Sequence, residues 1–124
     1  IQATGGSRPG ESFAEIAATA RRLGAAVMAD IATIGEAEEA VRDGGDLVAT
    51  TMVGNTAATV GAIRPPLDLL SQLLARLSVP VVIEGGVWTP EHVRDCFAAG
   101  AFAVVCGSAV TAPDIITRRL ISDI

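Results

Sequence analysis

Three side chains that can take part in proton chemistry stand directly after short apolar runs of the sequence. Asp30 follows AAVMA, Thr51 follows DLVAT and Glu84 follows VPVVI. Such runs are typical of buried parallel strands, whose carboxyl ends meet at one rim. A carboxylate there is partly desolvated, which is a setting in which carboxyl groups act as general acids or bases. We therefore expect two carboxylates and several hydroxyls, those of Thr50 and Thr51 among them, to converge on one rim.

Each of these carboxylates also has a simpler interpretation. Asp30 alternatively caps the turn that follows it, since aspartate is a common capping residue. Glu84 alternatively forms an ion pair with a neighbouring arginine at the rim. The sequence gives the position of both groups but not their environment.

Two glycine-containing turns follow the last two apolar runs, and both come just before a helical pattern. They are Gly85-Gly86 and Gly107-Ser108. Glycine lets an anion approach the backbone closely, and backbone N–H groups at such turns bind phosphate. Barrel enzymes frequently hold phosphate at these last two loops. We therefore predict a phosphate site there, although the glycines alternatively serve only to form tight turns.

Other polar and aromatic residues near the rim have ordinary interpretations. His92, the single histidine, is predicted on a solvated helix face, and Trp88 either walls the site or covers a loop. The segment 52–66 is either a lid over the rim or a surface loop. Solvated helix ends are predicted for four arginines, namely Arg21, Arg22, Arg118 and Arg119.

The elements that position these residues alternate between strand and helix. Strands are expected at 25–30, 46–51, 79–84 and 101–106. Helices are expected near 11–23, 34–43, 66–77, 90–99 and 113–123. Thr33 to Glu36 has the spacing of a capping box, and Thr89-Pro90-Glu91 is a typical helix start. Fully apolar strands that alternate with helices predict a parallel sheet covered by helices, as in a (β/α) barrel.

The number of strands is about half of what a barrel needs. Four strands are predicted, with residues 1–4 resembling the end of another. A closed barrel has eight strands and typically about 250 residues. We therefore expect a single domain over residues 1–124 that supplies half of a barrel. It is either part of a longer protein or a half-barrel that pairs with another copy as a homodimer.

The composition excludes several classes of protein. The chain has 124 residues and a net charge of −5, and its nine basic residues are all arginine. An acidic chain without basic clusters argues against nucleic-acid or anionic-membrane partners. Cys96 and Cys106 lack metal-ligand spacing and are expected to be buried intracellular thiols. With no apolar run long enough to span a membrane and no visible signal peptide, a cytoplasmic protein is expected.

Taken in order, four segments resemble one enzyme family. MADIAT, VATTMVGNT, PVVIEGGVWTPEHV and AVVCGSAVTAPDIITRR are similar to the C-terminal half of the bacterial N-acetylmannosamine-6-phosphate 2-epimerases. The opening IQATGGSRPGES also resembles the segment after the fourth strand of that family. The resemblance implies a phosphate-binding (β/α)8 barrel that interconverts N-acetylmannosamine 6-phosphate and N-acetylglucosamine 6-phosphate. It implies no metal, nucleotide or redox cofactor.

The resemblance also implies roles for individual residues. The family removes a proton from C2 of the sugar and returns it on the other face, using a lysine and a glutamate. The glutamate falls on Glu84, and a substrate-contacting aspartate falls on Asp30, with Thr51 assigned beside it to substrate binding. Phosphate would be held by backbone at Gly85 and Gly86, and at the Gly107-Ser108 turn.

Several positions depart from the family pattern. The chain contains no lysine. Gln2 stands where an aspartate is usual, and Gly86 and Ala112 stand where arginines are usual. We expect the isolated chain to lack epimerase activity, because half of the acid/base pair is absent. The alternatives are another phosphate-binding barrel enzyme, or a non-catalytic half-barrel that associates with itself.

Overall fold

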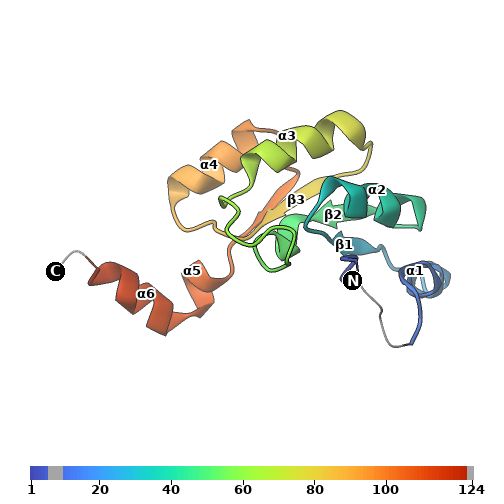
Figure 1. Cartoon of the computed structure of the whole chain (residues 1–124), viewed down its shortest axis with the longest axis horizontal. Coiled ribbons are helices and arrows are strands. Elements are labelled where there is room, and N and C mark those ends of the chain that lie inside the picture. The colour runs from blue at the N-terminus through green and yellow to red at the C-terminus, as the bar shows by residue number, and fades with distance from the viewer. Residues whose placement is uncertain (6–9, 123–124) are drawn as a thin grey trace.

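The computed structural model describes residues 1–5 and 10–122, which form one parallel sheet flanked by helices (Figure 1). The strands are β1 (Met28–Asp30), β2 (Leu47–Ala49), β3 (Val81–Glu84) and β4 (Ala103–Val105), and they lie in the order β1-β2-β3-β4. Gln2 adds a parallel bridge to Asp30 at the free edge of β1. The predicted parallel sheet, with a short strand contribution from residues 1–4, is confirmed.

Helices connect the strands as the sequence predicts. The five expected helices are α1 (Phe13–Arg22), α2 (Ile34–Arg42), α3 (Leu67–Arg76), α4 (Pro90–Ala98) and α6 (Pro113–Leu120). Two short helical turns were not predicted, the 3-10 turn η1 (Thr50–Met52) and α5 (Ser108–Thr111). Thr33 and Glu36 form the expected capping box at the start of α2, and the Thr89 hydroxyl caps α4.

The core lies between the sheet and the helices α2, α3 and α4, which run along one side of it (Figure 1). Alternate strand residues point to this side, including Ala29, Val48 and Ile83, all of which are fully buried. Leu70 and Leu73 of α3 pack against them. Because side chains alternate across a strand, Asp30 and Glu84 fall on the opposite face of the sheet.

The prediction of a buried thiol is confirmed for Cys96 and wrong for Cys106. Cys96 is buried on α4, where burial raises the pKa of its thiol, with the nearby Asp95 charge adding to the effect. Cys106, in contrast, is exposed. It follows β4, which is the last strand of the sheet and has no neighbouring strand on its outer side among the described residues. An apolar run at such an edge looks like a buried strand in sequence but is not covered in space.

Apolar side chains are exposed around that edge. Phe102 precedes β4, and Val105 is its last residue. Val110 lies on α5, and Ile115 and Leu120 lie on α6. Helix α6 contains no buried residue. None of the helices in the described part of the chain is both long and apolar enough to cross a membrane.

The packing of α3 onto the sheet is expected to contribute much of the stability. Leu73 is fully buried against the strands, so Leu73→Ala removes apolar contacts and leaves a cavity. We expect the free energy of unfolding, measured by urea denaturation, to fall by about 2–5 kcal/mol. The control Leu23→Ala, at a side chain that is 81% exposed, is expected to change it little. Equal effects of the two substitutions would contradict this assignment of the core.

Candidate active site

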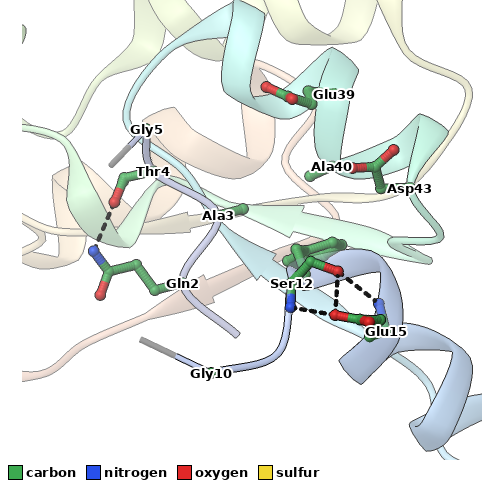
Figure 2. Close-up of a pocket in the computed structure, with 11 residues that line it drawn as sticks. Gln2, Ala3, Thr4, Gly5, Gly10, Ser12, Glu15, Glu39, Ala40 and Asp43 are labelled. Carbon is green, nitrogen blue, oxygen red and sulfur yellow. Dashed lines mark hydrogen bonds between the residues drawn. The ribbon is translucent and has the colours of Figure 1, made fainter. Parts of the chain in front are cut away.

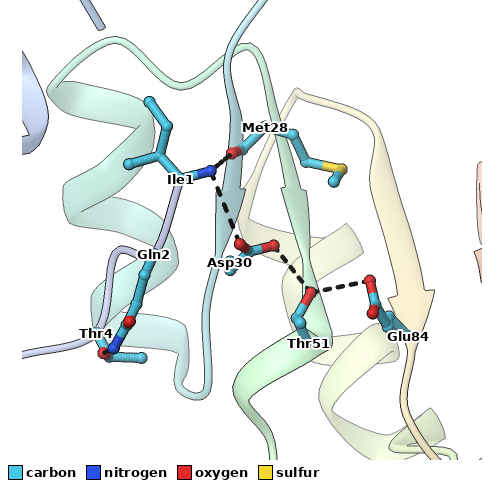
Figure 3. A network of polar contacts seen from close by, with 7 residues as sticks. All are labelled: Ile1, Gln2, Thr4, Met28, Asp30, Thr51 and Glu84. Atoms are coloured by element: carbon cyan, nitrogen blue, oxygen red, sulfur yellow. Dashed lines mark hydrogen bonds and ion pairs between the residues drawn. The ribbon is translucent and has the colours of Figure 1, made fainter. Parts of the chain in front are cut away.

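The structure brings together the three rim residues that the sequence analysis proposed. The Thr51 hydroxyl lies 2.9 Å from Oδ1 of Asp30 and 3.1 Å from Oε2 of Glu84, so it stands between the two carboxylates (Figure 3). The other oxygen of Asp30 lies 3.7 Å from the amino group of Ile1. All three rim side chains are partly buried, and they belong to the ends of three adjacent strands.

This row of oxygens can relay a proton. A hydroxyl carries a single hydrogen, so Thr51 donates to one carboxylate at a time. It accepts a hydrogen bond from the other only when that carboxyl group holds a proton. The arrangement therefore connects Asp30 to Glu84 through one hydroxyl, and neither carboxylate has an arginine partner among the described residues. The alternative that Glu84 forms an ion pair with an arginine at the rim is not what the structure shows.

Thr50 fixes the position of Glu84, a role that the sequence analysis missed. Its hydroxyl donates to the carbonyl oxygen of Glu84 at 2.9 Å and accepts from the Glu84 N–H at 3.0 Å. Thr50 is fully buried and is the one polar residue in the core of the described chain. The signal for it in the sequence is a threonine inside a buried apolar run, where an unpaired hydroxyl would be costly.

A cavity of about 450 Å³ opens in front of Glu84. Thr51 and Glu84 line it together with both glycine-containing turns, Gly85-Gly86 and Gly107-Ser108. Asp30 does not line this cavity and lies behind Thr51. The predicted acid/base residue and the predicted phosphate turns therefore share one cavity, while the aspartate reaches it only through a hydroxyl.

The segment 52–66 forms part of the cavity wall, which agrees with its interpretation as a cover over the rim. Arg64 and Asn55 from this segment line the cavity. Gly86 has a φ of +75°, and a Cβ there would collide with Cβ of Arg64 and lie 2.8 Å from its carbonyl carbon. Glycine at position 86 is therefore needed for the Arg64 backbone to pass over the turn.

Trp88 lines the cavity and is held from two sides. Its backbone N–H donates to Nδ1 of His92 at 3.2 Å, and the guanidinium of Arg119 lies 4.4 Å from its ring centre. A guanidinium over an indole face is a favourable cation–π contact. His92 is thus partly buried and bonded, so the prediction of a solvated position is wrong for this residue. Arg119 and Arg21 are exposed in the last turns of α6 and α1, as predicted, and Arg21 pairs with Asp46 at 3.1 Å.

A second cavity, also about 450 Å³, lies between the N-terminal segment, the start of α1 and the C-terminal part of α2 (Figure 2). Gln2 lines this cavity rather than the one at Glu84, and its amide donates to the Thr4 hydroxyl at 2.6 Å. Glu15 is held by the Ser12 cap, whose backbone N–H and hydroxyl lower the pKa of that carboxyl. The two cavities share no lining residue.

The residues described provide no obvious metal site. No group of three or more His, Cys, Asp or Glu side chains comes close enough to hold an ion in residues 1–5 and 10–122.

Comparison with known proteins identifies the family. A family model described as "Putative N-acetylmannosamine-6-phosphate epimerase" matches residues 1–124. The chain belongs to this epimerase family. Relatives named "Putative N-acetylmannosamine-6-phosphate 2-epimerase" include one from Enterobacter sp. (strain 638), 48% identical over 79% of this chain and 43% of the relative. Another, from Shouchella clausii, is 40% identical over 98% of this chain and 55% of the relative.

Solved structures agree with the epimerase fold. The N-acetylmannosamine-6-phosphate 2-epimerase from Clostridium perfringens superposes on all of this chain and 55% of its own length, with a TM-score of 0.95 and 34% identity. A thiamine phosphate pyrophosphorylase from Pyrococcus furiosus, at 21% identity and a TM-score of 0.63, shares the fold alone. The predicted barrel architecture is confirmed, and the chain spans about half the length of the curated relatives it matches.

The hydrogen bonds of Thr50 are expected to matter for the stability of this epimerase-family chain. Thr50→Val keeps the shape of the side chain but leaves the N–H and C=O of Glu84 without their partner. We expect a loss of about 1–3 kcal/mol in the free energy of unfolding, measured by urea denaturation. Thr50→Ser retains the hydroxyl and is expected to lose clearly less. If Thr50→Val and Thr50→Ser lower the free energy of unfolding equally, the two hydrogen bonds do not stabilise the end of β3.

Proposed function

We propose that this chain supplies the glutamate side of an N-acetylmannosamine-6-phosphate 2-epimerase site. The observation that carries the proposal is that the Glu84 carboxylate lines a cavity whose walls include both glycine-containing turns. A sugar phosphate has two features to be recognised, a dianionic group and a carbon acid. The cavity offers backbone-rich turns for the first and a carboxylate for the second. Family membership supports the choice of an amino-sugar phosphate as substrate.

Epimerisation at C2 requires that a proton leave one face of the carbon and return to the other. A single base on one face returns the proton where it found it, so two groups are needed. Glu84 serves as one of them. The second, by family resemblance a lysine, has no counterpart among the 124 residues. Thr51 and Asp30 then accept or supply the proton that Glu84 exchanges, through the bridging hydroxyl.

The phosphate is proposed to bind at the turns Gly85-Gly86 and Gly107-Ser108. Backbone N–H groups bind phosphate without the entropy cost of ordering a long side chain. With the phosphate at these turns, the sugar extends across the cavity toward Glu84 and Thr51, which line the same space. The free thiols of Cys96 and Cys106 fit the reducing environment of the cytoplasm, where we place the protein.

A chimera tests the proposed activity. The portion of the Clostridium perfringens epimerase that has no counterpart in this chain would be joined ahead of Ile1, because the superposition covers every residue of this chain. We expect the chimera to convert N-acetylmannosamine 6-phosphate to N-acetylglucosamine 6-phosphate. In deuterated water, NMR should show deuterium entering at C2. Glu84→Gln in the chimera should lower the rate by roughly a hundred- to ten-thousandfold.

Glu38→Gln in the same chimera is the matched control, since Glu38 pairs with Arg76 on the outer helices and lies outside the cavity. It should leave the rate unchanged. A chimera that folds, as judged by circular dichroism, yet turns over neither sugar phosphate would count against the proposed activity. Full activity of the Glu84→Gln chimera would contradict the role of Glu84 as an acid/base group but not the proposed activity. Preference for another phosphorylated substrate would favour the wider class of phosphate-binding barrel enzymes.

The 124-residue polypeptide by itself is predicted to be inactive and to self-associate. It has no lysine to complete the acid/base pair, and its apolar side chains at β4, α5 and α6 are exposed. Light scattering after gel filtration should give the mass of a homodimer, with no deuterium entering the sugar at C2. Turnover by this polypeptide would refute the two-group mechanism, and a stable monomer would refute the pairing. If the polypeptide is a dimer and the folded chimera is inactive, the two results together would favour the non-catalytic alternative.

A further inference from the structure

Arg64 is the single cationic side chain that lines the cavity in front of Glu84 within the described residues. It comes from the segment 52–66 rather than from a strand end or a helix. Its backbone passes over Gly86, which lacks the Cβ that would block it. Its side chain then runs past Gly85 toward Gly54. A Cβ built on Gly85 would lie 3.7 Å from the Arg64 Cδ, and one on Gly54 would lie 3.3 Å from its Nε.

The guanidinium of Arg64 has no hydrogen-bond or ion-pair partner among residues 1–5 and 10–122. Arg42, at the surface end of α2, also has none, whereas Arg21 pairs with Asp46, Arg76 with Glu38 and Arg118 with Asp114. Arg64 differs from Arg42 in lining the cavity. The Arg64 side chain is exposed, so water satisfies its donors in the free protein. Its charge and its five N–H donors are thus available to a ligand that enters the cavity.

The electrostatics of the cavity favour such a role. Glu84 is the one acidic side chain that lines it, and a phosphate dianion entering beside a carboxylate meets repulsion. Glycine turns supply N–H dipoles but no net charge. A guanidinium adds a full positive charge and a planar pair of donors that matches two phosphate oxygens. The backbone and Cδ of Arg64 lie against the Gly85-Gly86 turn, where the phosphate is proposed to bind, while its Nε and Cζ lie beside Gly54. The exposed side chain lines the same cavity as the turn.

We propose that Arg64 binds the phosphate group of the substrate, as a cation that the segment 52–66 carries over the glycine turn. The inference rests on the proposed function, because it takes the cavity to be the sugar-phosphate site. On this proposal Arg64, which lies in the segment 52–66 and not at a strand end, is the residue that distinguishes a phosphorylated sugar from an unphosphorylated one. The same contact ties the segment 52–66 to the ligand.

The test compares ligand binding by the chimera described above and by its variants in NMR titrations. The ligands are N-acetylglucosamine 6-phosphate, inorganic phosphate and unphosphorylated N-acetylglucosamine. We expect Arg64→Gln to weaken binding of the two phosphorylated ligands roughly ten- to a hundredfold, since a hydrogen bond to a charged group contributes about 1.5–3 kcal/mol. Binding of the unphosphorylated sugar should not change. Arg64→Lys keeps the charge but not the planar pair of donors. Its affinity for the phosphorylated ligands should lie between that of the unaltered chimera and that of Arg64→Gln.

Arg42→Gln is the matched control, because it removes the same charge from an exposed arginine at the C-terminal end of α2, outside both cavities. It should bind as the unaltered chimera does. Urea denaturation of the Arg64→Gln chimera establishes that the variant is folded. If the Arg64→Gln chimera binds phosphorylated ligands as tightly as the unaltered chimera, the assignment of Arg64 is wrong while the phosphate site stands. If the folded, unaltered chimera binds no phosphorylated ligand, the assignment and the phosphate site both fail.

Discussion

The pairing of the Thr50 side chain with the backbone of Glu84 is the constraint on which the site depends. Strand β2 ends at Ala49, before the chain turns into η1, whereas β3 continues to Glu84. The backbone of Glu84 therefore lacks a partner strand on that side, and the Thr50 hydroxyl bonds both its N–H and its C=O. Because those groups are fixed, the carboxylate is directed across the rim to Thr51 and into the cavity.

Gly86 shows that one residue can satisfy two requirements at the same site. Its positive φ turns the chain sharply after β3, and its missing Cβ leaves room for the Arg64 backbone. A side chain at this position would collide with the segment that crosses it. The cationic side chain that lines the cavity among the described residues belongs to the same segment, at residue 64. The glycine and the path of the segment therefore depend on each other.

Most of the fold follows from local patterns, whereas the finer features of the site depend on contacts between distant segments. The apolar runs and helix caps predicted β1 to β4 and the five longer helices, because these signals depend on residues that are close together in the sequence. Asp30, Thr51 and Glu84 met as expected, since parallel strands end at one rim. The sequence offered a cover over the rim as one interpretation of the segment 52–66, but its path over Gly86 was not predictable, because no period or motif specifies it. Nor was the stacking of Arg119 on Trp88, which joins α6 to a loop about 30 residues earlier.

The lining of the cavity contains one side chain of each charge, and this bears on how the proposed substrate would bind. Among the described residues Glu84, with Asp30 behind it, is the acidic side chain of the lining and Arg64 is the cationic one. If the cavity takes a sugar phosphate, as proposed, a dianion placed against Glu84 would meet repulsion in a partly desolvated space. The same ligand with its phosphate at Arg64 would avoid that repulsion and leave the sugar to face Glu84. Charge would then favour one orientation before any contact to the sugar hydroxyls is made.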